Sequence, residues 1–304
     1  MHQAAGALRV LALVVAGIVL VIAAGWASIY FVSENRLNQR IDVPAESIAV
    51  PTDITSIQRG QHLASAVAAC VDCHGPHLAG KVFMDDPGLG RIVPPNLTRG
   101  RGGVGGTFSN ADFARAIRHG VNPSGRRLLI MPSDDYNQFS DADLGAIIAY
   151  IRSMPAIDAS LPTNEIRILG RILFATGQLA LQPATNVDHF AQRPRSPAPG
   201  VTSEYGAYLA LSAGCPSCHG PGLSGGKIPQ APPNTVPASN ITPAALGAWS
   251  EADFLRVMRT GTRPDGRRLD AYMPWPYFAQ MTDDELRAIW RFLQAVPPRA
   301  TGSH

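Results

Sequence analysis

The sequence predicts an all-α protein in which one long apolar helix at the N-terminus precedes two tandem copies of the same helical domain. Three observations support this prediction. Residues 10–32 form a run of 23 residues without a charge. Several short segments of the first half recur in the second half at a nearly constant offset. Glycine and proline together account for 55 of the 304 residues, and this content favours short helices joined by irregular loops.

The apolar run is long enough to cross a membrane. As a helix with a rise of about 1.5 Å per residue, it extends about 34 Å, more than the roughly 30 Å hydrocarbon core of a bilayer. A cleaved signal peptide is the alternative, but its apolar region is normally about 7–15 residues long. Trp26, Tyr30 and Phe31 resemble the aromatic residues that gather at a membrane interface. We predict a transmembrane anchor over residues 1–33 and a polar tether over residues 34–51.

Helical patterns define a first folded unit, which we place at residues 52–156. Apolar residues recur at helical spacing over residues 54–69. Ser109 is a good N-cap residue for a second helix, and Gly120 is suited to end it in the left-handed conformation. A start that resembles a capping box at Ser140 begins the last helix of the unit.

The second unit, residues 201–298, repeats this order. Cys70 and Cys215 are 145 residues apart, and Asn96 and Asn240 are 144 apart. The offset is 141 at the middle helix and 142 at the last helix, so it changes only in the loops. The pattern therefore indicates duplication of a whole domain and excludes a short-period repeat.

Residues 157–200 form the predicted inter-domain segment, and residues 299–304 form a tail. Within the inter-domain segment, residues 165–181 are mostly apolar and predict an amphipathic helix. We expect this helix to pack across the two domains. Contact with a partner subunit or with the membrane surface is the alternative.

Charge is low and evenly spread. The net charge is +3, residues 52–156 carry ten Lys or Arg and nine Asp or Glu, and residues 201–298 carry eight of each. Neither unit has the charge excess of a domain that binds nucleic acid. We therefore expect no nucleic-acid partner.

The four cysteines of the chain all lie in two copies of one motif, CxxCH. This is the attachment signature for a c-type haem, whose vinyl groups form thioether bonds with the two thiols while the histidine binds the iron. We predict two covalently bound haem c groups, and the expected residues fall into two kinds. The thiols are those of Cys70, Cys73, Cys215 and Cys218, and the proximal ligands are His74 and His219.

Paired cysteines have three other common uses. A zinc site takes two such pairs, but Cys73 and Cys215 are 142 residues apart. A thioredoxin-like redox pair lacks a nearby βαβ pattern and leaves the following histidine unexplained. Structural disulfides form in oxidising compartments. Haem attachment accounts for the histidines as well as the cysteines.

Each haem iron needs a distal ligand or an open position. Met131-Pro132 and Met273-Pro274 occur at matched places, 57 and 54 residues beyond the proximal histidines, so we predict Met131 and Met273 as the distal ligands. A role as core methionines is the alternative. Other candidates have no such match: we read Met258 as a core residue, Met84 as unmatched, and His62, His77 and His119 as surface or structural residues.

Several weaker signals remain open. Paired arginines recur at matched positions and either bind haem propionates or form a solvated loop; they are Arg126, Arg127, Arg267 and Arg268. Asn96 and Asn240 either hydrogen-bond near a haem edge or set a turn. The glycine-rich residues 102–106 follow no strand and lack the Lys-Ser/Thr of a phosphate loop, so we expect a flexible loop.

The order of these motifs resembles class I cytochrome c domains. It is more closely similar to the cytochrome subunits of bacterial membrane-bound dehydrogenases that oxidise alcohols, aldehydes or gluconate. The similarity covers residues 52–298 and rests on CxxCH, Asn-Leu/Ile-Thr, Ser-x-Ala-Asp-Phe, Gly-x-x-x-x-Gly-Arg-x-Leu and Met-Pro. It implies helical domains, haem ligated by His74 with Met131 and by His219 with Met273, and electron transfer from a catalytic subunit towards quinone or an oxidase.

We therefore expect a membrane-anchored dihaem cytochrome that relays electrons and carries no substrate chemistry of its own. Haem c is attached outside the cytoplasmic membrane, so we expect a single-pass anchor in a bacterial inner membrane with the haem domains in the periplasm. The expected partner is a dehydrogenase catalytic subunit or a terminal oxidase. The alternatives are an electron-input subunit of an oxidase or photosynthetic complex, and a dihaem peroxidase with one open iron.

Overall fold

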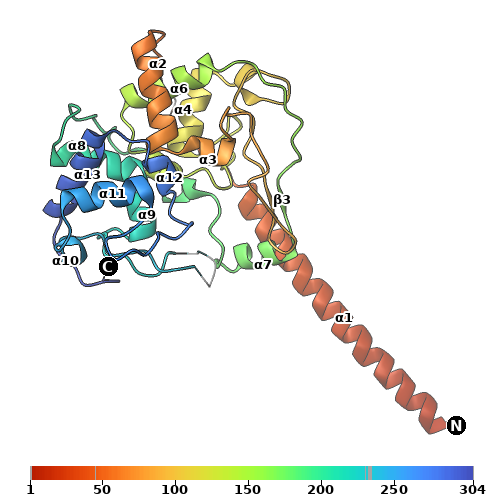
Figure 1. The fold of residues 1–304 in the computed structure, drawn as a ribbon. Coiled ribbons are helices and arrows are strands. Elements are labelled where there is room, and N and C mark those ends of the chain that lie inside the picture. The colour runs from red at the N-terminus through yellow and green to blue at the C-terminus, as the bar shows by residue number, and fades with distance from the viewer. Residues whose placement is uncertain (1, 45, 230, 232–234, 304) are drawn as a thin grey trace.

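The fold is described from a computed structural model for residues 2–44, 46–229, 231 and 235–303. Helix α1 (His2–Leu37) projects as one rod from a folded part that contains the other labelled elements (Figure 1). Among the described residues it is the one helix long and apolar enough to cross a membrane, with a mean hydropathy of 2.7, and its apolar stretch is not buried within the protein. The predicted N-terminal apolar helix is confirmed.

Two similar helical units follow α1. In unit 1, α2 (Ile54–His62) continues into a π-helical turn, η1 (Leu63–Val67), and the remaining helices are α3 (Cys70–His74), η2 (Val104–Gly106), α4 (Asn110–His119), α5 (Ser133–Tyr136) and α6 (Asp141–Ser153). Unit 2 contains α8 (Ser203–Ser212), α9 (Cys215–His219), α10 (Pro243–Leu246), α11 (Glu251–Thr260), α12 (Trp275–Phe278) and α13 (Asp283–Ala295). The prediction of a mainly helical protein is confirmed.

In each unit the first and last helices cross at a glycine. A Cβ atom on Gly60 of α2 would lie 1.9 Å from the carbonyl oxygen of Ala146 in α6. A Cβ atom on Gly206 of α8 would lie equally close, 1.9 Å, to the carbonyl oxygen of Ala288 in α13. Only glycine permits such close approach of two helices, so the two units share the packing that sets their cores.

The predicted helix ends are found at the expected residues. Ser109 accepts a hydrogen bond from the backbone N–H of Asp112, whose carboxylate accepts one from the backbone N–H of Ser109. The same capping box recurs at Ser250 of unit 2. Gly120 ends α4 with a left-handed φ of 62°. Local capping chemistry therefore fixes the middle helix in both units.

A small antiparallel sheet was not predicted. Strands β1 (Met84–Asp86), β2 (Gly90–Ile92) and β3 (Glu165–Ile166) pair in the order β1-β2-β3, with Arg91 opposite both Asp85 and Glu165. Strands of two or three residues are too short to show a period of two in the sequence.

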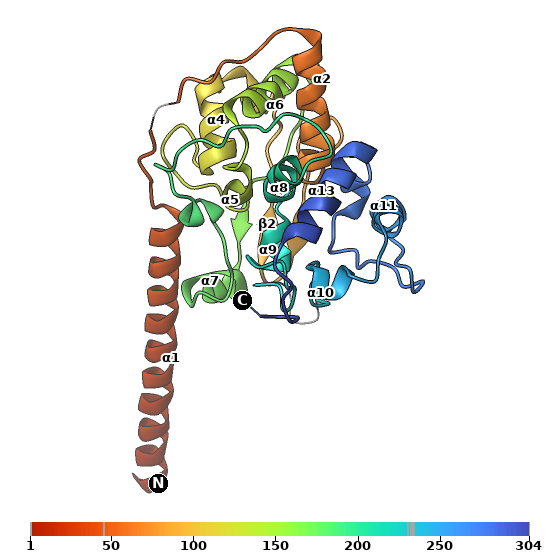
Figure 2. The same cartoon turned by 90° about the vertical axis from the view of Figure 1, so that its left-hand side faces the viewer.

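Helix α7 (Ile168–Ala175) follows β3 directly, and η3 (Pro183–Asn186) follows α7. Our expectation that this inter-domain helix packs across the two domains is wrong. The guanidinium of Arg171 donates to Ser33 and Glu34 of α1, and α7 lies beside α1 in both views (Figures 1 and 2). A short helix with one arginine among apolar residues does not reveal its partner in the sequence.

The residues predicted to form a tether lie against unit 1. The backbone N–H of Ile41 donates to the carbonyl of Gly125 at 2.9 Å. Glu46 pairs with Arg118 at 2.8 Å and with His119 at 3.1 Å, and both of these α4 side chains are fully buried. The chain between α1 and α2 is thus attached to unit 1 at Ile41 and at Glu46.

The glycine-rich segment at residues 102–106 is packed, and the expectation of a flexible loop is wrong. A Cβ atom on Gly102 would lie 2.1 Å from the carbonyl oxygen of Ala159, and one on Gly105 would lie 2.3 Å from that of Leu97. Val104 begins the 3-10 helix η2. The glycines serve close backbone approach, which composition alone does not distinguish from mobility.

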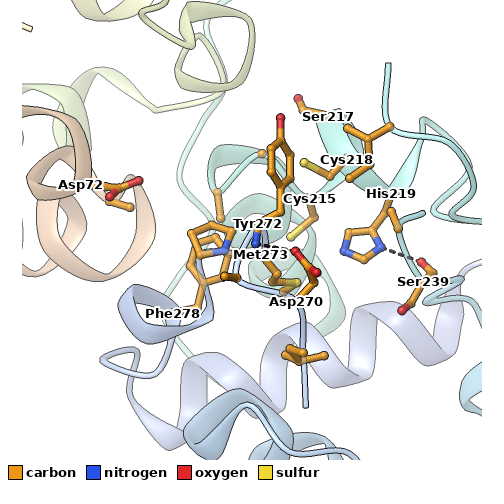
Figure 3. A pocket seen from close by; sticks show the side chains of 18 of the residues that line it. Asp72, Cys215, Ser217, Cys218, His219, Ser239, Asp270, Tyr272, Met273 and Phe278 are labelled. Carbon is orange, nitrogen blue, oxygen red and sulfur yellow. Dashed lines mark hydrogen bonds between the residues drawn. The ribbon is translucent and has the colours of Figure 1, made fainter. Parts of the chain in front are cut away.

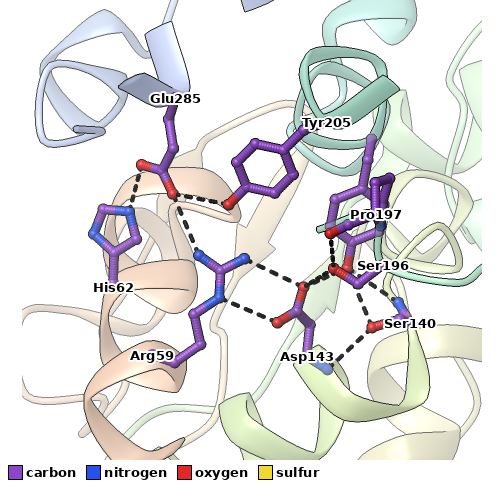
Figure 4. A network of polar contacts seen from close by, with 9 residues as sticks. Arg59, His62, Ser140, Asp143, Ser196, Pro197, Tyr205 and Glu285 are labelled. Atoms are coloured by element: carbon purple, nitrogen blue, oxygen red, sulfur yellow. Dashed lines mark hydrogen bonds and ion pairs between the residues drawn. The ribbon is translucent and has the colours of Figure 1, made fainter. Parts of the chain in front are cut away.

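The two units meet through a network of polar side chains related by the duplication (Figure 4). Arg59 of unit 1 pairs with Asp143 of its own unit at 3.2 Å and with Glu285 of unit 2 at 3.3 Å. The hydroxyl of Tyr208 in unit 2 donates to Asp143 at 2.6 Å, and His62 of unit 1 lies 2.7 Å from Glu285. Arg59 and His62 of unit 1 and the hydroxyl of Tyr208 in unit 2 thus hold two buried carboxylates.

Residues at matched positions of the repeat fill this network. Asp143 and Glu285 each stand at the third position of the last helix, where the backbone amide binds the N-cap hydroxyl. Arg59 occupies the place of Tyr205, and His62 occupies the place of Tyr208. The prediction that His62 is structural is confirmed, and its role is to join the units.

Candidate functional site

Each CxxCH motif forms a short helix that a left-handed residue introduces. Ala69, with φ 45°, precedes α3, and Gly214, with φ 72°, precedes α9. Gly75 and Gly220 follow the two histidines, both with φ 78°. The chain therefore turns sharply into and out of the motif in both units.

The two motif histidines are buried and held in one orientation. His74 is 7% exposed, and its Nδ1 lies 2.9 Å from the carbonyl oxygen of Pro95. His219 is also 7% exposed, and its Nδ1 lies 2.7 Å from the carbonyl oxygen of Ser239 (Figure 3). Burial lowers the pKa of both imidazoles below the usual value, so both rings are neutral at pH 7. A neutral ring whose Nδ1–H donates to a carbonyl has the Nε2 lone pair free for a metal.

The surroundings of the four thiols differ from those that activate redox cysteines. All four are free of disulfides. Burial raises the pKa of Cys70 to about 12 and that of Cys73 to about 11, whereas reactive redox cysteines have lowered pKa values. Over residues 2–44, 46–229, 231 and 235–303, no three His, Cys, Asp or Glu side chains gather as a metal-binding group. The alternatives to haem attachment lack structural support.

Unit 2 contains a large cavity beside its motif. The cavity has a volume of about 660 Å³, and Cys215, Cys218, His219 and Met273 line it together (Figure 3). A second cavity of about 400 Å³ shares His219 and Met273 and reaches Asn240. The structure thus brings the predicted thiols, proximal histidine and distal methionine of unit 2 to one space with mostly apolar walls.

The two Met-Pro segments have the same local structure. The amide N–H of Ser133 donates to the carbonyl of Met131 at 2.7 Å, and that of Trp275 donates to the carbonyl of Met273 at 2.8 Å. A one-turn helix follows each segment, α5 in unit 1 and α12 in unit 2. Both methionines are partly buried against the core.

The motif of each unit contacts the one-turn helix of the other unit. The hydroxyl of Tyr277 in α12 donates to Asp72 of the first motif at 2.9 Å. The hydroxyl of Ser217 in the second motif donates to Asp135 of α5 at 2.5 Å. Asp72 and Cys73 of unit 1 also line the unit 2 cavity. The two attachment motifs therefore face each other across the interface.

Asp135 is a partly buried acid at this interface. A Cβ atom on Gly214, next to Cys215, would lie 2.5 Å from one of its carboxylate oxygens. Burial raises its pKa to about 6, although the Ser217 hydroxyl opposes that shift. Sequence reasoning missed Asp135 because no matched acid stands at Tyr277, its counterpart in unit 2.

Comparison with known proteins agrees with this geometry. Residues 55–151 match the family model described as cytochrome c oxidase, cbb3-type, subunit III, and residues 203–297 match the model described as cytochrome c. The two units are cytochrome c domains. Two such domains, and a similar dihaem relative, support two covalently bound haem c groups.

Several relatives that match most of the chain are cytochrome subunits. The chain is 28% identical to the fructose dehydrogenase cytochrome subunit of Gluconobacter japonicus over 84% of its length, and 30% identical to the gluconate 2-dehydrogenase cytochrome c subunit of Pantoea cypripedii over 79%. It spans 56% and 59% of those two relatives. It is also 28% identical to a diheme cytochrome c-type protein of Cereibacter sphaeroides, with 93% of this chain and 97% of that protein covered.

The matched asparagines of the two cytochrome c domains set turns. The side-chain amide of Asn96 donates to the carbonyl of Ile157 at 2.7 Å, and its oxygen accepts from the amide of Thr98. Asn240 makes the equivalent bonds to Arg299 and Thr242. Each asparagine thereby fastens the segment that follows the last helix of its domain.

The matched arginines have different surroundings in the two domains. Arg126 and Arg127 donate to Asn38 and Gln39 at the end of α1. Their counterparts, Arg267 and Arg268, line the unit 2 cavity, as does Arg263, which donates to Ser239. The cavity-lining arginines of the second domain stay as candidate propionate partners, whereas those of the first domain hold the chain that leaves α1.

The other candidates lie outside the haem sites or in the core. Met258 is 8% exposed and belongs to the core, as predicted. Met84 lies in β1, and His77 is exposed. His119 is fully buried with its Nδ1 2.9 Å from that of His189, so its predicted structural role is confirmed.

Proposed function

We propose that this chain is a membrane-anchored dihaem cytochrome c that relays single electrons on the periplasmic side of a bacterial inner membrane. In this proposal it is the cytochrome subunit of a respiratory dehydrogenase complex and has no substrate chemistry of its own. The observation that carries the proposal is the facing pair of motifs, in which Asp72 contacts Tyr277 and Ser217 contacts Asp135.

The unit 2 cavity and the matched positions of the repeat support the proposed ligand sets. Cys70 and Cys73 would hold one haem and Cys215 and Cys218 the other, and the iron ligands would be His74 and Met131 in the first site and His219 and Met273 in the second. When bound, haem c with a histidine and a methionine supplies a reversible one-electron couple at a raised potential, with no open iron position.

The residues around each ligand set orient and shield it. The carbonyls of Pro95 and Ser239 fix the imidazole rings and raise their basicity as ligands. The mostly apolar walls, with Phe278 of α12 among them, surround the second site. The contacts between the motifs hold the cysteine edges of the two sites at one interface, which favours exchange of electrons between them.

The membrane, the periplasmic side and the partner rest on further inferences. The exposed apolar helix α1 supports an anchor, and attachment of haem c outside the cytoplasmic membrane supports the periplasmic side. The names of the fructose and gluconate dehydrogenase relatives support a dehydrogenase partner. The match of residues 55–151 to the subunit III family of an oxidase favours a second candidate, an electron-input subunit of a terminal oxidase.

The ligand assignment is tested by Met273→Ala. We expect the reduction potential of one haem to fall and that of the other to stay near its starting value, because a thioether ligand stabilises the reduced iron. Met131→Ala should reverse this pattern, and Met258→Ala is the matched buried control. Unchanged potentials in both Met273→Ala and Met131→Ala would show the assignment to be wrong.

Two further measurements separate the functional alternatives. Carbon monoxide binding to the reduced wild type would indicate an open iron and favour a peroxidase. Purification in mild detergent identifies the partner: a dehydrogenase subunit supports the main proposal, an oxidase supports the second candidate, and recovery of this chain alone at every step contradicts both obligate complexes.

A further inference from the structure

Helix α7 presents apolar side chains that the rest of the protein does not cover. Ile168 is 62% exposed and Leu169 is 46% exposed. The opposite side of the helix is packed: a Cβ atom on Gly170 would lie 2.1 Å from the carbonyl oxygen of Leu89, and Phe174 is 7% exposed. The exposed pair therefore lies on the outer side of a helix that is otherwise held in place.

Two arginines fix α7 on α1. The guanidinium of Arg171 donates to the Ser33 hydroxyl at 2.9 Å and to Glu34 at 3.0 Å, and it lies 4.4 Å from the ring centroid of Tyr30. Arg36 of α1 donates to the carbonyls of Phe174 and Ala175 at the end of α7, both at 3.1 Å. The contacts made by both arginines determine the height of α7 along α1.

That height coincides with the end of the apolar run. A helix needs about 20 residues to cross a hydrocarbon core of about 30 Å. Counted from Val10, just after Arg9, the core ends near Tyr30. Trp26 and Phe31, which are 36% and 73% exposed, lie at the same end of α1. The contacts of Arg171 and Arg36 that hold α7 on α1 therefore begin where the hydrocarbon region ends.

The figures agree with this placement. In Figure 2, α7 lies at the lower margin of the folded part, beside the upper portion of α1, and the remaining length of α1 extends below it. Helix α2 lies at the opposite end of the folded part in both views (Figures 1 and 2). A bilayer crossed by α1 would therefore reach α7 and leave α2 in water.

We infer that α7 is a membrane-surface helix whose exposed apolar side chains, Ile168 and Leu169, enter the boundary between the lipid headgroups and acyl chains. This inference rests on the proposed membrane anchoring by α1. A short interfacial helix adds little to the strength of attachment. Its effect is on orientation. Two points of contact with the bilayer fix the tilt of the cytochrome domains, whereas α1 alone would let the domains tilt relative to the bilayer.

The bilayer fits this face better than another protein does. The face continues the aromatic end of α1, and its cationic residue, Arg171, is directed towards α1 by its pairing with Glu34. No charged side chain belongs to the exposed pair, as the insertion of a helix face into lipid requires. A partner subunit would need to reach the same level beside α1.

A probe at position 168 tests the inference. Ile168→Cys in the full haem-loaded chain is labelled with an environment-sensitive fluorophore. The label would attach to the introduced cysteine, because the native thiols would be bound to haem. The protein is reconstituted into phosphatidylcholine–phosphatidylglycerol vesicles, with or without lipids that carry a quencher just below the headgroup. Ile54→Cys is the matched control, because Ile54 is 66% exposed at the start of α2. An unchanged haem spectrum verifies the fold of each variant.

We expect the quencher lipid to reduce emission from position 168 several-fold more than from position 54, and a water-soluble quencher to show the reverse order. Equal responses in vesicle-bound protein would overturn the inference and leave the anchor intact. Protection of position 168 from both quenchers would indicate contact with a second copy and would also overturn it. Release of the whole chain from vesicles by alkaline wash would instead contradict anchoring by α1.

Discussion

Replacing Asp135, the partly buried acid between the two haem motifs, should stabilise the protein in a pH-dependent way. Asp135→Asn keeps the size of the side chain and an oxygen that accepts from Ser217. It removes the charge that burial disfavours, because the pKa of Asp135 is raised from 3.8 to about 6 in the folded state. The unfolded chain has no such penalty.

The magnitude follows from the difference between the two pKa values. A carboxyl with a raised folded pKa costs nothing below pH 3.8, where both states are protonated, and its cost is complete above pH 6. A difference of about 2 pKa units corresponds to about 3 kcal/mol of unfolding free energy at pH 7.5. At pH 4.5 the same relation leaves about 1 kcal/mol. The variant should therefore gain about 2 kcal/mol more at pH 7.5 than at pH 4.5.

Urea unfolding of the full chain in detergent, followed by the Soret circular dichroism, measures both differences. Asp284→Asn on the exposed start of α13 is the matched control, and surface changes of this kind alter stability by less than about 0.5 kcal/mol. A stability difference for Asp135→Asn that is the same at both pH values, or a destabilisation at pH 7.5, would refute the reasoning from burial.

Two further changes probe the packing of the domains. Gly60→Ala and Gly206→Ala each place a methyl group against a helix backbone and should lower the free energy of unfolding by about 1–3 kcal/mol, measured by thermal unfolding. The control is Gly200→Ala, whose new methyl group meets no atom within 4 Å and should leave stability unchanged. Equal melting temperatures for all three variants would contradict the helix crossing. Arg59→Ala removes one partner of the buried Glu285 carboxylate and should lower the free energy of unfolding by about 3–5 kcal/mol. Small-angle scattering should report separated domains. An unchanged radius of gyration would count against the view that this network joins the domains.

The duplicated helices and both attachment motifs could be predicted because each rests on local chemistry. Ser109 and Gly120 cap the two ends of their helix. The two CxxCH motifs predict haem c through the types and spacing of their residues. The matched positions of Met131 and Met273 predict them as distal ligands. The structure places Met273 in one cavity with His219.

What the sequence did not reveal depends on contacts between distant residues. The role of His62 arises only when Glu285 of the other domain comes within 2.7 Å. The packed glycines of residues 102–106 and the seat of α7 on α1 also depend on tertiary neighbours. Composition shows that such residues are small or apolar, and does not show what lies opposite.

The attachment of residues 38–51 to the first cytochrome c domain determines how this protein can search for partners. A flexible linker of 14 residues would let the cytochrome domains move about 20 Å from the end of α1. Here Ile41 is bonded to Gly125, and Glu46 is held by Arg118, so that freedom is absent. With α1 anchored in a membrane as proposed, electron donors and acceptors would meet the cytochrome domains at a constant height above the bilayer. Lengthening the segment would add reach only if these contacts were also removed.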